Sequence, residues 1–531
     1  MRPFTTLFIL AFAASCGRGA GAPGMPAPET QPPADTATAA GRPSIDPDRL
    51  RSDLMVFASD SFRGREAGEP AALLAARFLA DRLSEIGLQP AGDSGFYQRV
   101  HLRQQRLGGD TRFRVTTPRG QVDLALGEDV VPLLSLGQGA PLPRLSAEGD
   151  VVFAGYGTSI PERQRDDLAG LDLRGKAVVV IHGAPPGLDS ARTAELASPA
   201  MLGQRLGLVA QRGAAAIVLL LTGPTARDFD QIAAQMRSGA MTLADSASPV
   251  DGPRPLPLVL IGLPREGSPL LPAGWPSDDK PRPLSGHRFS GNVDLVRHDR
   301  VTYNVVAVAP GSDAALARTY VAFGAHLDHI GVVSPVNGDS VANGADDDGS
   351  GSMGLLAIAR SIAEHPPRRS TLFVWHTAEE QGLLGSQYFT SHPTVPLDSI
   401  VAQLNADMIG RNHPDSIYIV GPMAAPNDQS KALGAVVDSV NAGLPRSFLV
   451  NREWDSPTHP EQIYFRSDHY NYARHGIPIV FFTTGLHEDY HRVSDEVSKI
   501  DFDKLARVAA FMRDVGMAVG NSSASVRSAS P

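Results

Sequence analysis

Short apolar runs alternate with amphipathic segments along the C-terminal half of the chain. The runs are continuously apolar, which is typical of strands buried on both faces. They cover residues 304–309, 319–324, 371–375, 400–404 and 477–483. Apolar residues at helical spacing predict helices over 353–364, 431–441 and 502–519. Strands that alternate with helices in this way predict an α/β domain with a mostly parallel central sheet covered on both faces.

The N-terminal part carries one clear amphipathic helix. Leucines, Phe78 and Ile86 recur at helical spacing over residues 70–86, and Gly87 follows as a C-cap. Residues 96–102 and 112–115 resemble strands in their pattern. The segment DSFRGREAG (60–68) precedes the helix. It could line a site, but its charges and glycines favour a surface loop.

The character of the chain changes between residues 135 and 285. Short β runs and one helix lie among prolines, over 150–155, 176–182, 202–213, 215–221 and 256–262. This region contains no cluster of potential metal ligands. We predict a β-rich insert over 135–285 inside a discontinuous domain built from 48–134 and 286–520. The order of GYG (155–157), DDLAGLDLRGKAVVV (166–180), a helix and an apolar strand resembles the protease-associated domain.

Both ends of the chain lack the pattern of a folded domain. Residues 1–15 combine a basic start with an apolar stretch too short to span a bilayer as a mature helix, so we predict a signal peptide. Cys16 follows small residues and resembles the cysteine of a bacterial lipobox, which implies cleavage before Cys16 and a lipid anchor on its thiol. An ordinary signal peptide cut nearby is the alternative. Residues 16–47 are predicted to be a flexible tether, and 521–531 a disordered tail.

Composition narrows the functional classes. A length of 531 residues exceeds one ordinary domain, and a net charge of −9 gives no electrostatic footprint for nucleic acid. Cys16 is the only cysteine, so disulfides cannot stabilise the fold. We expect an exported protein of the periplasm or outer envelope, with possible membrane anchoring only through Cys16.

Three consecutive carboxylates, Asp346, Asp347 and Asp348, lie between glycines directly before the predicted helix 353–364. Like charges this close repel, and a divalent cation would relieve the repulsion. The ordinary alternative is an acidic loop at a helix N-terminus. Taken alone, this stretch leaves calcium and zinc both open.

Metal-type residues also follow four of the apolar runs. In open α/β sheets, ligands bind beyond the carboxyl ends of the strands, so residues dispersed in the sequence can converge there. The residues after these runs are His326, Glu380, Asp407 and His491, and Asp347 of the carboxylate triplet can join them. Two histidines and three carboxylates exceed the ligand set of one catalytic zinc and suit two metals that share a carboxylate and a water nucleophile. Each residue alone has an ordinary structural alternative, but their joint placement favours a metal site. The histidines favour zinc, because calcium sites are built from oxygen.

Six segments carry a resemblance to a known family. They are GAHLDHIG (324–331), NGADDDGSG (343–351), HTAEEQGLLGS (376–386), NADMIG (405–410), FRSDHYNYARHGIP (465–478) and YHRVSDE (490–496). Together they closely resemble the di-zinc aminopeptidases, a family that includes bacterial leucyl aminopeptidases and glutamate carboxypeptidase-like enzymes. The likeness covers about 48–130 and 290–520. It implies a phosphorylase/hydrolase-like three-layer α/β sandwich with a mixed, mostly parallel central sheet.

The resemblance also implies a cofactor of two Zn²⁺ per chain. His326 and Asp407 would hold one zinc ion, and Glu380 and His491 would hold the other. Asp347 would bridge both.

Three further residues receive roles through the same resemblance. Asp328 would orient His326 by accepting its free ring N–H. Glu379 would be the general base that moves a proton from the bridging water to the leaving amine. Tyr490 resembles the tyrosine that steadies the tetrahedral oxyanion in some members of the family.

The resemblance divides the remaining residues near these motifs. It implies a cis peptide between Asp347 and Asp348 and leaves Asp346 as a dispensable neighbour. Five other histidines are expected to lack a direct role. We expect His376 and His469 to pack behind the site, and His329, His475 and His487 to lie in loops or at the surface.

The predicted function is an exported zinc metallopeptidase that acts on peptide substrates, most simply as an aminopeptidase. A carboxypeptidase or dipeptidase of the same family is one alternative. A receptor-like binding module that has lost its metals is another, and its expected mark would be missing ligands. A single-zinc cyclase of the same fold is a third.

Overall fold

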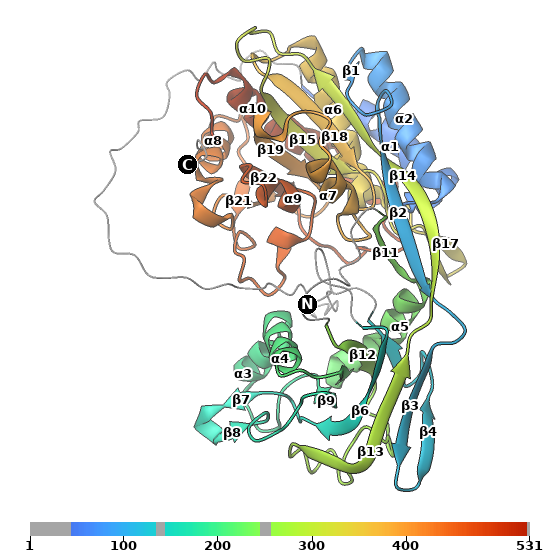
Figure 1. Cartoon of the computed structure of the whole chain (residues 1–531). Helices are drawn as coiled ribbons and strands as arrows, with labels where there is room; N and C mark the ends of the chain where they lie inside the picture. The colour runs from blue at the N-terminus through green and yellow to red at the C-terminus, as the bar shows by residue number, and fades with distance from the viewer. Residues whose placement is uncertain (1–43, 134–143, 245–255, 528–531) are drawn as a thin grey trace. The chain divides into compact units, whose positions relative to one another are not determined.

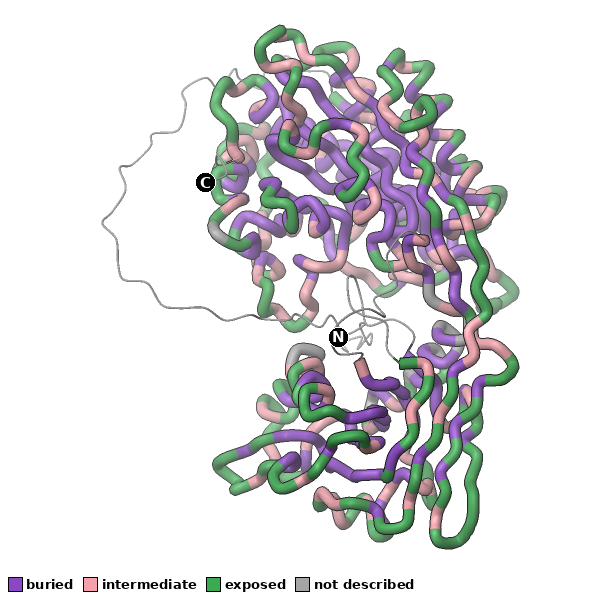
Figure 2. Tube along the Cα trace, in the orientation of Figure 1, coloured by how far each residue is buried: buried purple, intermediate pink, exposed green. Residues whose placement is uncertain are grey.

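The computed structural model describes residues 44–133, 144–244 and 256–527 of the chain (Figure 1). The described residues divide into two compact units, one formed by Arg103–Asp299 and the other by 44–102 with 300–527. Each unit has its own hydrophobic core, and buried residues concentrate along the strands (Figure 2). The sequence-based boundaries, 135 and 285, lie inside the first unit. They missed its outer strands because those strands pair with partners more than a hundred residues away.

The larger unit is built on a mixed sheet. Its strand order is β2-β14-β18-β15-β19-β22-β20-β21, with β1 beside β14. The bounds are β1 Gln89–Pro90, β2 Tyr97–Leu107, β14 Leu295–Ala309, β15 Tyr320–His326, β18 Ser370–His376, β19 Ile400–Ala406, β20 Ser416–Val420, β21 Leu449–Asn451 and β22 Ile479–Thr483. The four central strands are parallel to one another. Strand β14 runs antiparallel to β18, and β20 runs antiparallel to β22 but parallel to β21. The predicted mixed, mostly parallel sheet is confirmed.

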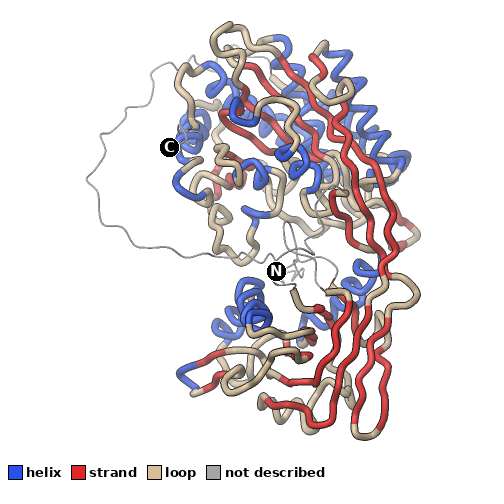
Figure 3. Tube along the Cα trace, in the orientation of Figure 1, coloured by secondary structure: helices blue, strands red, loops and turns tan. Residues whose placement is uncertain are grey.

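Helices cover both faces of this sheet (Figure 3). Alternate strand residues point to opposite sides, so Phe323 and Phe373 belong to one core cluster and Ala322 and Leu372 to the other. The first face is covered by α1 Pro47–Phe57, α2 Pro70–Ile86, α6 Gly351–Glu364, α8 Lys431–Ala442 and α10 Phe502–Asn521. The second is covered by α7 Leu384–Ser391 and α9 His469–Ala473. This is the predicted three-layer sandwich.

Local sequence signals explain where several helices begin and end. α2 ends at Gly87, whose φ of 82° is the left-handed conformation that glycine adopts without strain. α10 begins after Asp501, whose side chain accepts a hydrogen bond from the Lys504 N–H. α1 was missed from the sequence, although Asp46 caps it in the same manner. Ile45 is buried in the core, so the predicted tether ends before residue 47.

The smaller unit contains an eight-stranded sheet with the order β4-β3-β13-β6-β9-β10-β12-β5. Its elements are β3 Arg112–Thr117, β4 Gly120–Leu124, β5 Val130–Pro132, β6 Ser146–Phe153, β9 Ala177–Ile181, β10 Ala216–Leu220, β12 Leu258–Gly262, β13 Arg282–Asn292, α3 Ser190–Ala197, α4 Pro199–Gln211 and α5 Phe229–Ser238. Helices α4 and α5 pack on one face of the sheet. The resemblance of this unit to a protease-associated domain stays a prediction.

The ends of the chain were predicted with mixed success. The predicted signal peptide, Cys16 and most of the tether lie outside the described residues. The prediction of a disordered tail is wrong for residues 521–527, because the Arg527 guanidinium donates to the main-chain oxygens of Leu397 and Ile400 at 3.2 and 3.1 Å. Composition could not indicate those partners. Within the described ranges, no helix has the length and apolar character needed to cross a membrane.

Candidate metal centre

The carboxyl ends of four adjacent parallel strands bring together the residues that the sequence disperses. His326 ends β15 and lies level with His376, the last residue of β18. Asp407 follows β19 directly, Glu379 and Glu380 lie in the loop after β18, and His491 lies in the loop after β22. All five predicted metal residues meet at this edge of the sheet.

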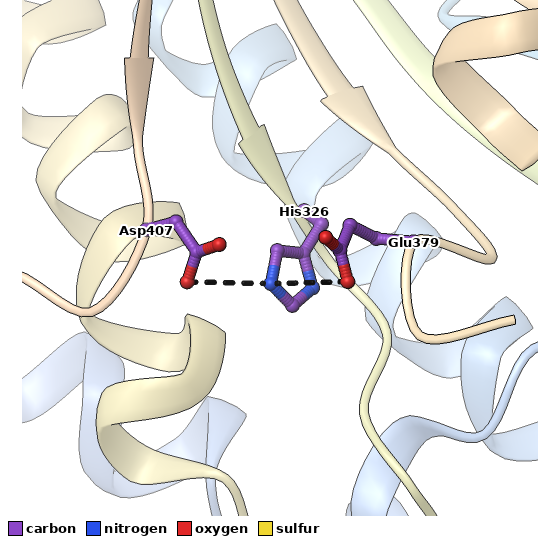
Figure 4. A group of neighbouring side chains, drawn as sticks. All are labelled: His326, Glu379 and Asp407. Carbon is purple, nitrogen blue, oxygen red and sulfur yellow. Dashed lines mark ion pairs between the residues drawn. The ribbon is translucent and has the colours of Figure 1, made fainter. Parts of the chain in front are cut away.

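One group of side chains, called here the first pocket, comprises His326, Glu379 and Asp407 (Figure 4). The His326 Nε2 atom lies 3.6 Å from Asp407 Oδ1 and 3.9 Å from Glu379 Oε2. Figure 4 shows the imidazole between the two carboxylates. All three residues are buried.

The second pocket comprises His329, Glu380 and His491. His491 Nε2 lies 2.9 Å from Glu380 Oε2, and His329 Nδ1 lies 2.7 Å from Glu380 Oε1. The side chain of His491 is 34% exposed, whereas that of His326 in the first pocket is 1% exposed. The second pocket therefore offers the route of access to the centre.

Asp347 lies between the two pockets. Its Oδ1 is 3.3 Å from His326 Nε2, and its Oδ2 is 3.2 Å from His491 Nε2. One carboxylate thus presents one oxygen to each pocket, which is the arrangement that a bridging ligand requires.

Burial and carboxylate repulsion shape the first pocket. Burial raises the pKa of Glu379 well above its usual range, and the Asp407 carboxylate adds to that rise. Burial also raises the pKa of Asp407, although His326 opposes the shift. Burial lowers the pKa of His326, but Glu379 and Asp407 outweigh it and hold that pKa well above the usual range. A proton or a metal ion is therefore strongly favoured among these groups.

The second pocket balances its charges with histidines. Burial raises the pKa of Asp347, but the neighbouring imidazoles of His326, His329 and His491 outweigh it and hold that pKa well below its usual range. Burial likewise opposes ionisation of Glu380, yet the charge of His491 and a hydrogen bond from His329 lower its pKa to about 2. Asp347 and Glu380 are therefore carboxylates at neutral pH.

The donors fit divalent metals of the zinc type. The His326 Nδ1 atom lies 3.2 Å from the main-chain oxygen of Asp328, which can only accept, so Nδ1 donates when the ring is neutral. Nε2 then presents its lone pair to the pocket. The buried atoms His326 Nε2 and Asp347 Oδ2 have no hydrogen-bond partner among the described residues. Imidazole nitrogens and carboxylate oxygens with free lone pairs are the ligands that zinc binds.

The three residues of the Asp triplet, Asp346 to Asp348, make different contacts. Asp348 accepts hydrogen bonds from the main-chain N–H groups of His326, Met408 and Gly351, which ties β15, β19 and α6 together. The bond between Asp347 and Asp348 is cis, as the resemblance implied.

Asp346 is not the dispensable neighbour that the sequence suggested. It is fully buried, accepts from the Gly410 N–H at 2.7 Å, and lies 3.1 Å from His487 Nε2. It therefore connects the loop after β19 with the loop that carries His491. His487 was expected in a loop or at the surface, yet its side chain is buried by this contact.

Two charged residues brace the Asp triplet, and sequence reasoning missed both. The Arg65 guanidinium donates to the main-chain oxygens of Leu327, Asn343 and Gly344, which join the loops around His326 and Asp347. Arg65 is buried, so the expectation that 60–68 is a surface loop is wrong there. Burial lowers its pKa to about 10, so it stays charged at neutral pH. The only sequence signal was the charged segment itself.

Asp495 is the second brace. Its carboxylate accepts hydrogen bonds from the main-chain N–H groups of Asp346 and Asp347 at 3.0 to 3.1 Å. It lies four residues after His491 and is fully buried. The loop that supplies His491 is thereby attached to the backbone of Asp347. The segment YHRVSDE contained this residue, but no local pattern indicated its partner.

Asp328 and Tyr490 differ in detail from their expected geometry. The nearest Asp328 carboxylate oxygen is 3.9 Å from His326 Nδ1, so the main-chain oxygen of Asp328, not its carboxylate, accepts from that ring. The carboxylate accepts from the Glu379 N–H instead, at 3.1 Å. The Tyr490 ring stacks on His491 at 3.9 Å between centroids, and burial raises its pKa to about 12, so its hydroxyl keeps its proton.

The remaining histidines divide into buried and exposed groups. His376 and His469 are buried behind the centre, as expected, and His376 Nε2 lies 3.0 Å from the Tyr472 hydroxyl. His475 is exposed. His329 lies in a loop, as expected, but its side chain is fully buried in the second pocket. No sequence pattern indicated that His329, only three residues after His326, lies in the other pocket.

Comparisons with known proteins agree with this geometry. Residues 304–516 match the profile of Peptidase family M28. Leucine aminopeptidase 1 of Arthroderma gypseum is 29% identical over 236 residues, which span 42% of this chain and 59% of that protein. Leucine aminopeptidase 1 of Trichophyton rubrum is 30% identical over 232 residues, or 41% of this chain and 58% of that protein. The match thus covers less than two thirds of these relatives.

A solved structure extends the likeness to the whole fold. The aminopeptidase from Aneurinibacillus sp. strain AM-1 is similar with a TM-score of 0.53 at 19% identity, covering 89% of this chain and 93% of that chain. At this identity the likeness concerns the fold. The match to the profile of Peptidase family M28 spans residues 304–516, which include the elements that carry the centre.

Proposed function

We propose that this chain is a di-zinc metallopeptidase that releases N-terminal residues from peptides. One observation carries the proposal: the two oxygens of Asp347 lie 3.3 and 3.2 Å from one histidine of each pocket. A single-metal site has no use for such a shared carboxylate. All five ligand-type residues are present, which argues against a receptor-like module without metals. The leucine aminopeptidase relatives support the amino-terminal polarity.

The residues divide the work as follows. His326 and Asp407 would hold one zinc ion, Glu380 and His491 would hold the other, and Asp347 would contact both. Bound zinc would supply Lewis-acid polarisation of the scissile carbonyl and acidify a water molecule.

Glu379 is positioned to move the proton. Its carboxylate lies at the edge of the first pocket, 3.9 Å from His326 Nε2, and its own N–H is held by Asp328. A buried carboxylate with a raised pKa can accept a proton from water and pass it to the leaving amine. The protonated Tyr490 hydroxyl, on the open side beside His491, would donate to the developing oxyanion.

We also propose that the protein is exported and held at the membrane by lipid on Cys16. The support is the apolar N-terminal segment that ends in the only cysteine. Fractionation of cells that express the chain or its Cys16→Ser variant tests this. The proposal expects the variant to leave the membrane fraction; wild-type protein in the cytosol contradicts export.

The activity is tested by comparing peptides with free and blocked ends. An aminopeptidase should cleave peptides with a free N-terminus and tolerate a C-terminal amide, but it should reject N-acetylated peptides. The reverse preference would instead indicate a carboxypeptidase. Zinc content is determined on the same sample, with two equivalents expected.

The general base is tested by Glu379→Gln. The variant should keep both zinc ions yet lose hydrolysis by about 10²- to 10⁴-fold, the usual contribution of a general base. Glu488→Gln is the matched control, because Glu488 is exposed and lies near His491 in sequence. Near-normal turnover by Glu379→Gln would refute the assigned role.

A further inference from the structure

His329 has no part in the function proposed above, yet it lies inside the second pocket. It follows β15 by three residues, and its side chain is fully buried. Its ring meets the His491 ring edge to face at 5.7 Å between centroids. A buried histidine beside ligand-type carboxylates is expected to contact one of them.

The distances separate the two oxygens of Glu380. His329 Nδ1 lies 2.7 Å from Oε1, whereas His491 Nε2 lies 2.9 Å from Oε2. His329 Nδ1 is farther from Asp347 Oδ2, at 3.7 Å. His329 therefore addresses the oxygen of Glu380 that His491 does not.

The chemistry of this contact assigns the donor. An ionised carboxylate can only accept hydrogen bonds, so Nδ1 must carry the proton. A separation of 2.7 Å is the length of a charge-assisted N–H···O bond. With Oε1 engaged, Oε2 remains for an ion that also contacts Asp347 and His491.

We infer that His329 is a positioning residue of the second zinc pocket, which donates its Nδ1–H to Glu380 Oε1 and so presents Oε2 alone to the ion. The inference rests on the zinc binding proposed above and adds a residue to it. It explains why the pocket holds two histidines although only one is needed as a ligand.

The backbone makes room for this ring. Gly344 has φ 55°, and a Cβ atom there would come within 2.6 Å of the His329 ring and 2.2 Å of the Asp347 main-chain oxygen. The Gly344 main-chain oxygen is held by Arg65 at 2.9 Å. The His329 slot is therefore formed by the same loop that carries the Asp triplet.

Direct coordination by His329 Nδ1 is the competing arrangement, because His329, Asp347 and Glu380 are close enough to share one ion. Metal-absorption spectroscopy counts imidazoles and separates the two. If only His326 and His491 bind two zinc ions, the count is about one imidazole per zinc. If His329 also binds, the count is about 1.5.

The test compares His329→Leu with His329→Asn in the full chain. These side chains are similar in shape, but only asparagine retains a donor near the position of Nδ1. Zinc affinity is measured by competition with a chelator, and folding by the thermal unfolding of the zinc-free proteins. His329→Leu should weaken the second zinc equivalent by about 10- to 100-fold, the usual effect of losing an outer hydrogen bond to a ligand. His329→Asn should restore the affinity to within about threefold of wild type. The exposed His475→Leu is the control.

Each outcome decides a separate statement. Normal affinity in a folded His329→Leu protein overturns the inference and leaves the proposed function intact. Equal losses in both variants, with an imidazole count that falls from about 1.5 to one, overturn it in favour of direct coordination. A wild-type chain that binds no zinc overturns the proposed function and the inference together.

Discussion

The two pockets share Asp347 but differ in charge and exposure. The first pocket sets one imidazole, His326, among several buried carboxylates, and its side chains are almost inaccessible. The second contains two imidazoles, and His491 is one third exposed. Carboxylate pKa values rise in the first pocket, whereas that of Glu380 in the second falls to about 2.

If the centre binds the two zinc ions proposed above, this difference implies that the two pockets hold them unequally. The buried carboxylates around the first pocket outnumber its one imidazole, so an ion bound there should gain strong electrostatic attraction. Histidines already neutralise part of the second pocket, and water can reach it. We expect the first ion to be held more tightly and the second to exchange.

Asp347→Asn should affect both pockets at once and should cause the largest loss of zinc and of hydrolysis. An amide is a poor ligand and removes the shared charge, so both zinc equivalents should be lost. Several kcal/mol of metal stabilisation correspond to a fall in hydrolysis of at least about a thousandfold. Zinc analysis and peptide assays measure both effects. Asp346→Asn, one residue away, should keep both ions, because an amide oxygen can still accept from Gly410; loss of zinc there would contradict this assignment.

Substitution of one ligand in each pocket should show which of the two pockets holds its zinc ion more tightly. Asp407→Asn should leave one exchangeable zinc equivalent in the second pocket, and Glu380→Gln should leave one tightly held equivalent in the first. Loss of either ligand should lower the zinc affinity of its own pocket by about 10- to 100-fold or more. Competition with chelators of graded strength measures which ion remains. Equal affinities in the two variants would show that the pockets are equivalent after all.

The smallest effect concerns pH and the zinc-free chain. Burial raises the pKa of Asp328 to about 7 and that of Asp495 to about 6. Both values lie above the unfolded value of about 4, so between pH 4 and 7 these two groups bind more protons in the folded chain, and their contribution to stability falls as pH rises. The raised pKa values of Asp348, Glu379 and Asp407 act in the same direction. Burial lowers the pKa of His182 and His469 to about 4, which opposes the trend. The low pKa of Glu380 acts in the opposite direction, but only below about pH 4.5.

The check is the midpoint of thermal unfolding at about pH 5 and pH 7, with chelator and with zinc. The midpoint of the zinc-free chain should be lower at the higher pH. Zinc should reduce this loss, because the charge of a cation bound nearby lowers the pKa of Asp328 and Asp495. A zinc-free midpoint that increases with pH would contradict the direction of these pKa shifts.

The sheet and its helices were predictable because their signals are local. α2 was predicted at its observed bounds, and the four central strands were predicted to within two residues. Periodicity and continuous apolar runs reflect how each segment buries its own side chains. The boundaries of the smaller unit were not predictable in this way, because β13 closes its sheet only by pairing with β3 and β6.

Contacts of the centre were predicted where residues follow strands and missed where loops meet. His326 and Asp407 sit at strand ends, so their convergence follows from parallel pairing. Arg65 bonds to Asn343, just before the Asp triplet, and Asp495 bonds to the triplet itself, both from segments far away in the sequence. Their side chains bond to main-chain atoms, which carry no residue-specific pattern.

From the sequence alone one could predict that two histidines and three carboxylates, ligands of the zinc type, gather at one edge of a parallel sheet. This was possible because the end of an apolar strand and the type of the residue that follows it can both be recognised within a short segment. Only the tertiary structure decided that Asp347 faces both histidines, that Asp346 and Asp348 are braces, and that His329 belongs to the centre. Those assignments depend on how loops from distant segments are placed, and the contacts that fix them join residues far apart in the sequence.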